Sequence, residues 1–196
     1  MAPRARTYTC RGDGGETDLP AAGRVSKCHL RVAACGALDE LNCAVGETVS
    51  WVEAFAASKR PHRGVRRWLL RIQRELFVLG SLVSGVRKAP RGHTSRHGAA
   101  VRRLESEIDV MTAELPECRG FILPGGGVAA SAAHRARAIC RRAERDCVAA
   151  VKDDPIAEAV LPYLNRLGHW LFVLARRLSK SAGGKEEFWR GPVKAR

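Results

Sequence analysis

The sequence predicts an all-α protein, an antiparallel up-and-down helical bundle of the ferritin-like type with five helices. Four segments place apolar residues at alternating spacings of three and four, the periodicity of one helix face, and a fifth segment places arginines at the same spacings. Between them lie stretches rich in Pro, Gly and small polar residues, and no strand pattern of comparable strength is present. Because 196 residues suffice for a single domain with a substantial core, we expect one domain over residues 1–196.

Each apolar stripe marks the buried side of one predicted helix. The stripes consist of Leu38, Leu41, Val45, Val49 and Val52; Val65, Leu69, Ile72, Leu76, Leu79, Val83 and Val86; Val101, Leu104, Ile108, Met111 and Leu115; and Val160, Leu164, Leu167, Leu171, Leu174 and Leu178. Helix-breaking residues predict connections at 58–64, 88–98, 116–127 and 153–155. We therefore expect a bundle over residues 30–179, flanked by an irregular N-terminal loop (1–29) and a C-terminal tail (180–196).

The remaining helix is the most informative segment, because it follows a Pro-Gly-Gly-Gly turn and carries a cationic stripe. It reads FILPGGGVAASAAHRARAICRRAER from Phe121 to Arg145. Glycines at a helix start leave backbone N–H groups free to face an anion, and the helix dipole favours negative charge at the same end. The members of the stripe recur at helical spacings and share one face: His134, Arg137, Arg141, Glu144 and Arg145.

The opposite face of this arginine helix offers only small side chains, among them Ala132, Ala136, Cys140 and Ala143. A face with so little bulk packs readily inside a bundle, and arginines within a bundle require an anionic partner. The helix therefore predicts a polyphosphate-binding face. The alternative is a solvated basic helix surface.

A glycine-rich loop precedes the first helix, in residues 8–18. Its glycines allow backbone amides to turn toward a phosphate and its threonines supply hydroxyls: Gly12, Gly14, Gly15, Thr9 and Thr17. Asp13 is a candidate ligand for a divalent metal, directly or through water, and Lys27 is a candidate phosphate contact. The alternatives are an ordinary turn and a solvated lysine.

Two further helices carry polar residues beside their apolar stripes. Asp39 lies on a strip of small and polar residues in the first helix, where an acid requires a cationic partner, and Arg137 is the candidate. The alternative places Asp39 near solvent. Asn165 and His169 lie one turn apart on the last helix, and Asn165 suits either an adenine or ribose edge or an ordinary hydrogen bond within the bundle.

Net charge and cysteine usage restrict the classes of partner. A net charge of +14 suits nucleic acid, an anionic membrane surface or an anionic small molecule, and the positive charges are mixed with acids rather than gathered in a basic block. Seven cysteines without a CxxC pair indicate reduced thiols in a cytoplasmic protein and no zinc site. No apolar run is long enough to span a bilayer. We expect neither a membrane nor a nucleic-acid partner.

Four motifs, in this order, resemble the PduO-type ATP:cob(I)alamin adenosyltransferases. They are TCRGDGGET (9–17), RVAACGALDELN (31–42), FILPGGG (121–127) with RRAER (141–145), and YLNRL (163–167). The similarity covers residues 8–178, and the DELN and RRAER motifs are specific when found together. It implies a five-helix bundle assembled as a homotrimer, with ATP at each subunit interface. The implied reaction transfers the 5′-deoxyadenosyl group of ATP to the cobalt of cob(I)alamin, which yields adenosylcobalamin and triphosphate.

The resemblance also implies roles for individual residues. The N-terminal ATP loop contributes Thr9, Cys10, Arg11, Gly12, Asp13, Gly15, Thr17, Asp18 and Lys27. The helices contribute further ATP contacts from Arg141, Arg142, Glu144, Arg145 and Asn165. Asp39 and Arg137 are implied to form a salt bridge across the subunit interface beside the corrinoid. Phe121 is implied to lie beneath the corrinoid and to exclude its lower axial ligand. The catalytic set is therefore Arg141, Asp39, Arg137 and Phe121.

Family membership further implies Mg²⁺ bound with ATP rather than by a protein-built cluster, a corrinoid reductase and an adenosylcobalamin-dependent acceptor enzyme. The chain departs from the family pattern at Arg11, where Thr or Asn is usual, and at Cys35 and Ala133. Arg11 leaves open a corrinoid escort without turnover. A basic nucleic-acid-binding bundle is the remaining alternative, although the sequence has no recognition-helix motif and no run of aromatics for base stacking.

Overall fold

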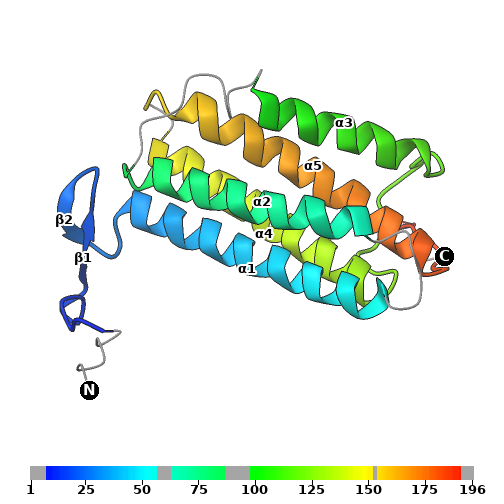
Figure 1. The fold of residues 1–196 in the computed structure, drawn as a ribbon, viewed down its shortest axis with the longest axis horizontal. Coiled ribbons are helices and arrows are strands. Elements are labelled where there is room, and N and C mark those ends of the chain that lie inside the picture. Colours follow the sequence, from blue (N-terminus) through cyan, green and yellow to red (C-terminus); the bar gives the residue numbers. More distant parts are fainter. Residues whose placement is uncertain (1–7, 57–62, 87–97, 152–153, 191–196) are drawn as a thin grey trace, which may run out of the picture.

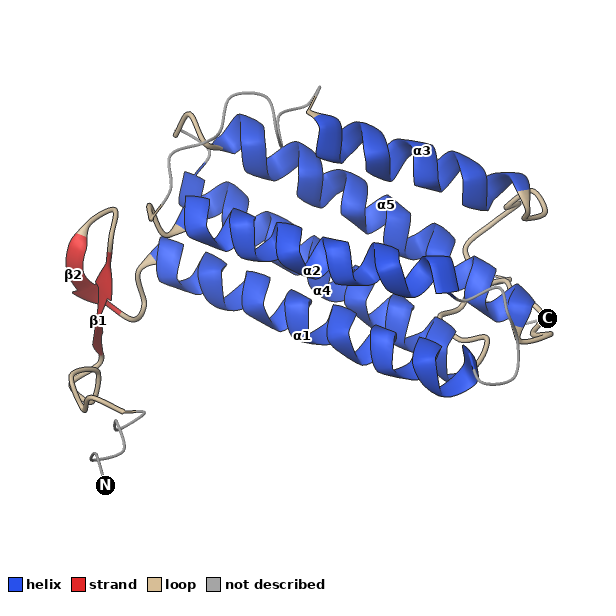
Figure 2. Ribbon diagram, in the orientation of Figure 1, coloured by secondary structure: helices blue, strands red, loops and turns tan. Residues whose placement is uncertain are grey.

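Five helices make up most of the chain that the structure describes (Figures 1 and 2). The structure is a computed structural model, and it describes residues 8–56, 63–86, 98–151 and 154–190. Its helices are α1 (Leu30–Ala56), α2 (Arg63–Val83), α3 (Ala99–Ala113), α4 (Val128–Val151) and α5 (Ala157–Ser181). Consecutive helices run in opposite directions, so the predicted up-and-down bundle is confirmed.

Helix α4 lies between α1 and α5 and packs against both along its length, while α2 packs on α1 and α3 packs on α5 (Figure 1). The inner face of α4 explains this central position. Its buried residues are almost all small: Ala130, Ala132, Ala133, Ala136, Cys140, Ala143 and Cys147. Small side chains let neighbouring helix backbones approach closely, so α4 fills the centre of the bundle without large core residues.

The predicted apolar stripes form the core, except for the end of the second and for Ile108 and Leu115 of the third, which are half-buried against it. The first and fourth stripes are buried throughout, as are residues 65–83 of the second. Val86 was predicted to continue that stripe, and this is wrong: its side chain is 64% exposed. The cause is local, since α2 ends at Val83 and Gly85 adopts a positive φ of 83°. The predicted connections at 58–62 and 88–97 lie outside the described residues.

The N-terminal region is a β-hairpin, and the expected irregular loop is therefore corrected for residues 16–26. Strand β1 (Glu16–Leu19) pairs antiparallel with β2 (Gly23–Ser26), in a register that sets Glu16 opposite Ser26. The hairpin turn is attached to the end of α2: Ala21 N–H donates to the Ser84 carbonyl at 3.0 Å, and Leu19 is buried. A Cβ at Gly85 would overlap Ala21, so this close approach requires glycine.

The C-terminal tail folds back on the segment before α4. Ile122 and Phe188 form an isolated antiparallel bridge, and Trp189 N–H donates to the Phe121 carbonyl at 2.8 Å. Arg176 of α5 forms a buried ion pair with Glu186 at 2.6 Å, which fixes the tail electrostatically. Residues 182–190 are thereby held against the turn from which α4 begins.

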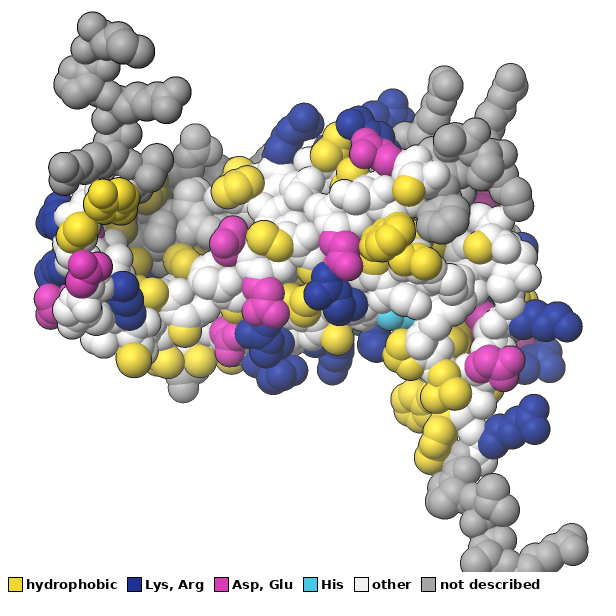
Figure 3. Space-filling model, turned by 90° about the horizontal axis from the view of Figure 1, so that it is seen from below, with side chains coloured by type: hydrophobic (Ala, Val, Ile, Leu, Met, Phe, Trp, Pro, Cys, Tyr) yellow, Lys and Arg dark blue, Asp and Glu magenta, His cyan; other side chains and the backbone are white. Residues whose placement is uncertain are grey.

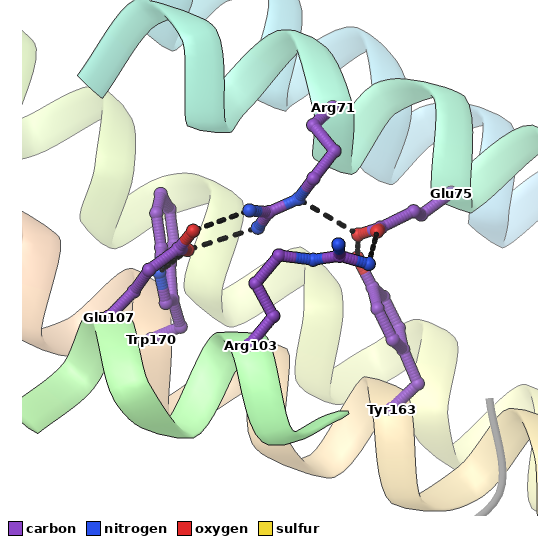
Figure 4. A network of polar contacts seen from close by, with 6 residues as sticks. All are labelled: Arg71, Glu75, Arg103, Glu107, Tyr163 and Trp170. Atoms are coloured by element: carbon purple, nitrogen blue, oxygen red, sulfur yellow. Dashed lines mark hydrogen bonds and ion pairs between the residues drawn. The ribbon is translucent and has the colours of Figure 1, made fainter. Parts of the chain in front are cut away.

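A buried polar network joins α2, α3 and α5 (Figure 4). Arg71 of α2 pairs with Glu107 of α3 and with Glu75 of its own helix. Helix α5 adds Tyr163, whose hydroxyl donates to Glu75 at 2.7 Å, and Trp170, whose Nε1–H donates to Glu107 at 2.9 Å. Burial by itself would lower the pKa of Arg71, but its hydrogen bond to Glu107 and the two carboxylate charges raise it, so the guanidinium stays charged.

We expect Glu107→Ala to reduce the free energy of unfolding by about 3 kcal/mol or more, because it leaves Arg71 charged and half-buried without its bidentate partner. Urea denaturation followed by circular dichroism measures this change. The matched control is Glu117→Ala, which removes an exposed pair with Arg119 and should cost about 0.5 kcal/mol or less. Equal losses in the two variants would contradict a structural role for the network.

Candidate functional site

The arginine face of α4 and the outer face of α5 enclose a pocket of about 130 Å³. It is lined by Arg137, Arg141, Glu144, Asn165, Gly168, His169 and Phe172. Within the described chain Arg141 makes no ion pair, and the Nε of Arg137 is buried without a hydrogen-bond partner. The two guanidinium groups share the pocket with one carboxylate, Glu144, and form no ion pair within the described chain, so they form a site for a multiply charged anion.

Neighbouring side chains set the shape of this arginine pocket. Asn165 donates to Glu144 at 3.1 Å, which bridges α5 to α4 along one side. The guanidinium of Arg137 lies 6.0 Å from the ring centroid of Phe172, a cation–π contact. Glu144 and Asn165 also line an adjoining groove of about 770 Å³ between α3, α4 and α5. Asn165 therefore stands where a ligand larger than a phosphate group would extend from the arginines.

Arg142 and Arg145 differ from Arg141 in their surroundings, although all three were predicted to contact ATP. Arg142 faces α1, where it pairs with Glu40, and the hydrogen bond that Arg142 donates to Glu40 raises the pKa of Arg142. Arg145 is exposed, as Arg141 is, and donates to the backbone carbonyl of Arg141 at 3.1 Å. The structure thus brings Arg141 together with Arg137, Glu144 and Asn165, and it holds Arg142 on the other side of the helix.

Asp39 and Arg137 do not meet within one chain. Asp39 is exposed on α1 and forms no ion pair with the part of the chain that the structure describes. Asn42, on the same helix, is instead buried and donates to the Gln73 carbonyl at 3.4 Å, which links α1 to α2. An exposed acid and an orphaned guanidinium on neighbouring helices remain available to groups outside the chain.

The glycine-rich loop forms a compact exposed unit at the base of the hairpin. Arg11 pairs with Asp18 at 3.1 Å, and Arg24 reaches the same carboxylate at 3.6 Å. Lys27 N–H donates to the Gly15 carbonyl at 2.9 Å, and the Lys27 ammonium lies 3.1 Å from the position of a Cβ on Gly12. Cys10 adopts a positive φ of 57°. The loop residues predicted to bind ATP, including Thr9, Asp13 and Thr17, are therefore gathered in one place.

This loop unit stands apart from the arginine pocket of the same chain. Figure 1 shows the hairpin beyond the N-terminal end of α1, whereas Arg141 lies midway along α4. Among the described residues, no hydrogen bond or ion pair joins residues 8–27 to the pocket. One chain therefore presents two separated groups of candidate phosphate contacts.

Phe121 is 80% exposed at the end of the bundle, so a role as a core residue that caps the bundle is excluded. Its ring contacts Trp189 edge-on, with centroids 6.5 Å apart. Leu123 and Trp189 are also exposed, and Figure 3 shows hydrophobic side chains gathered at one end of the molecule. This apolar surface suits a flat hydrophobic ligand.

Sequence reasoning did not specify the burial of His134 and missed Phe172. His134 was assigned to the same helix face as Arg137, and both do contact the ring of Phe172, but His134 is only 5% exposed and packs edge-on against that ring. Burial lowers the pKa of His134, and the charge of Arg137 lowers it further. Phe172 contacts Arg137 on one side and Arg176 on the other, at 6.0 Å in each case. In the sequence, the only signal for Phe172 was its position three residues after His169.

A family model described as cobalamin adenosyltransferase matches residues 7–178. The chain belongs to this family. The resemblance indicated by the four motifs is confirmed, and the matched range contains the glycine-rich loop, the arginine pocket and Phe121. Among the residues that the structure describes, no helix is long and apolar enough to cross a membrane.

Curated relatives and solved structures of this adenosyltransferase family are similar over nearly the whole chain. The corrinoid adenosyltransferase of Bacillus subtilis (strain 168) is 40% identical, covering 96% of this chain and 94% of that protein. The cobalamin adenosyltransferase of Cupriavidus metallidurans is 39% identical over 95% of each. A phenylalanine-to-alanine variant of the PduO-type ATP:corrinoid adenosyltransferase from Lactobacillus reuteri, complexed with cobalamin and ATP, matches with a TM-score of 0.82 and 31% identity, covering 95% of this chain and 100% of that one.

An arginine-to-lysine variant of the Lactobacillus reuteri enzyme, complexed with ATP, matches with a TM-score of 0.79 and 34% identity over 93% of this chain and 99% of that one. Agreement at this level of identity extends beyond the helical architecture to the family's activity. In the described part of this chain, no group of three or more His, Cys, Asp or Glu side chains could hold a metal ion.

Proposed function

We propose that this protein transfers the 5′-deoxyadenosyl group of ATP to the cobalt of cob(I)alamin and releases triphosphate. The observation that carries the proposal is Arg141, which forms no ion pair with the described residues and lines one pocket with Arg137 and Asn165. A triphosphate supplies the missing anionic partner. The resemblance of the chain to adenosyltransferases crystallised with ATP and cobalamin supports the same ligands.

The reaction explains why the chain needs no nucleophile or general base of its own. The electron pair on cob(I)alamin forms the cobalt–carbon bond at C5′, while the C5′–O bond breaks and its electrons leave with the triphosphate oxygen. The protein must hold C5′ in line with the cobalt and stabilise the charge that grows on the leaving group. Arg141 is placed for the second task, and the exposed apolar surface at Phe121 suits the face of the corrin ring.

Mg²⁺ is proposed to arrive with the phosphates of ATP, and Asp13 in the glycine-rich loop is the carboxylate offered to it. Arg11, where the chain departs from its family, forms an ion pair with Asp18 inside this loop. No observation favours a corrinoid escort without turnover or a nucleic-acid-binding bundle. The corrinoid reductase, the acceptor enzyme and the cytoplasmic location stay predictions.

A homotrimer is proposed because one chain holds the two halves of the site apart. The glycine-rich loop and the arginine pocket both offer phosphate contacts, yet they do not meet within the chain, and neither do Asp39 and Arg137. Contact between neighbouring subunits would bring the loop of one to the pocket of the next. ATP would then lie at each interface.

Arg141→Lys tests the polyphosphate site most directly. The substitution keeps the charge but loses forked hydrogen bonding. We therefore expect kcat/KM for ATP to fall roughly thirty-fold or more, which corresponds to a loss of about 2 kcal/mol in transition-state stabilisation. The loss of the cob(I)alamin absorption spectrum measures the rate. Arg135→Lys on the same helix, where Arg135 pairs with Glu47, is the matched control and should stay near wild type. Wild-type efficiency in Arg141→Lys would remove the main physical support for the mechanism.

Replacing Phe121 with Ala should impair the reaction from cob(II)alamin with a reductase more than the reaction from chemically reduced cob(I)alamin. The reason is that excluding the lower axial ligand makes cob(II)alamin easier to reduce, a step that prior reduction bypasses. KM for ATP should not change. Phe77→Ala, which truncates an exposed phenylalanine on α2, is the control. Equal impairment in both assays would indicate general corrinoid binding instead.

Sedimentation should show a trimer, and charge reversal should probe its interface. We expect Asp39→Arg to weaken assembly, and the double variant with Arg137→Asp to recover it, because the swapped charges can pair again across subunits. Asp109→Arg, which reverses an exposed acid on α3, serves as the control. A wild-type protein that sediments as a monomer and is fully active would refute the shared site.

A further inference from the structure

A second cavity, of about 160 Å³, lies where α4 begins. The Pro-Gly-Gly-Gly turn, the last turns of α5 and the returning tail enclose it. Its principal polar lining comes from Gly125, Gly126, His134, Arg176, Ser179 and Glu186. A group the size of a water molecule occupies about 30 Å³, so the cavity has room for a short polar side chain with its methylene stem.

The walls of this turn cavity contain hydrogen-bonding groups without partners in the described chain. The side chain of His134 is only 5% exposed, and its Nδ1 has no hydrogen-bond partner among the described residues. The N–H groups of Gly125 and Gly126 donate to no described residue. Gly125 and Gly126 are half-buried, whereas His134 is buried. A buried donor or acceptor without a partner costs free energy comparable to a lost hydrogen bond, so His134, with the turn amides beside it, indicates a site for a polar ligand.

The backbone of the turn is shaped to leave this space open. Gly126 has a φ of 88°, which favours glycine, and a Cβ on it would overlap the side chain of Ser179. Ser179 itself is buried. Only glycine therefore allows the turn to lie against α5 while its amides remain uncovered.

The charges around the cavity cancel. Arg176 forms its ion pair with Glu186 at 2.6 Å and also donates to the Pro116 carbonyl at 2.8 Å. Lys185 and Glu187, which also line the cavity, add one charge of each sign. Burial lowers the pKa of His134, so its imidazole is neutral and offers one donor and one acceptor. A neutral ligand that both donates and accepts fits this environment better than an anion.

We propose that the turn cavity is a subsite for one primary carboxamide arm on the rim of the corrinoid, bound between His134 and the amides of Gly125 and Gly126. The proposal rests on the proposed function, since acetamide and propionamide arms surround the corrin ring. Position supports it: Ile122 lines the cavity, and the adjacent Phe121 is exposed on the outside, where the ring face is expected. A ring over Phe121 therefore carries its rim arms toward this cavity.

The subsite predicts discrimination between an amide and an acid. A carboxamide donates its N–H to the acceptor nitrogen of His134 and accepts from the turn amides. A carboxylate in the same place has no N–H to donate and adds a charge to a balanced cavity, which costs free energy. Corrinoids in which the bound arm is hydrolysed to a carboxylate should therefore bind more weakly.

Two substitutions of similar size test the subsite: His134→Gln retains a donor and an acceptor, whereas His134→Leu has neither. We expect His134→Leu to raise KM for cob(I)alamin about ten-fold, as for the loss of one buried hydrogen bond, and His134→Gln to raise it by about three-fold or less. KM for ATP should not change in either variant. Dialysis of cob(II)alamin against each variant should give the same order of affinity without turnover.

A second measurement separates recognition from packing. Cobalamin monocarboxylates, each with one amide arm hydrolysed, are compared with cobalamin on wild type and on His134→Leu. At least one monocarboxylate should bind wild type about ten-fold more weakly than cobalamin, and this difference should vanish in His134→Leu. Equal losses in the Leu and Gln variants, or a preference that survives in His134→Leu, would overturn the subsite. A wild-type protein that makes no adenosylcobalamin and binds no corrinoid would refute the proposed function as well.

Discussion

The close approach of α4 to both α1 and α5 is the constraint on which the rest of the structure depends. Alanine and cysteine side chains line most of its buried face, so α4 contributes little bulk and the larger core side chains come from its neighbours. A helix buried on one side must present its polar residues on the other. The guanidinium groups of Arg137 and Arg141 thereby line a pocket against α5, where neither forms an ion pair with a described residue.

Helix α5 completes the site because its two sides have separate tasks. Tyr163 and Trp170 point toward the buried network and hydrogen-bond to Glu75 and Glu107, which sets the position of the helix along and about its axis. The side that faces α4 carries Asn165, His169 and Phe172 into the arginine pocket. An interaction on the far side of the bundle therefore keeps Asn165 in register with the arginines.

The two ends of the chain place different chemistry at opposite ends of the bundle. The hairpin, attached to the end of α2, carries the glycine-rich loop away from the pocket, which accounts for the proposal of a shared site between subunits. The tail, fixed by Arg176 and Glu186, closes over the turn before α4. The exposed ring of Phe121 and the neutral cavity behind it then lie next to each other, which suits a ligand with a flat face and polar arms.

The sequence alone determined the helices, their order and most of the core, because a periodicity of 3.6 residues is a local property that burial enforces along each helix. It also determined the arginine helix and its small opposite face. Only the tertiary structure decided which arginines are left unpaired: Arg142 pairs with Glu40 on α1, whereas Arg141 forms no ion pair with the described residues. It also decided the hairpin, whose polar strands depend on contact with Gly85. The burial of His134 was likewise decided by the tertiary structure, since helical spacing alone does not specify which neighbours cover a residue.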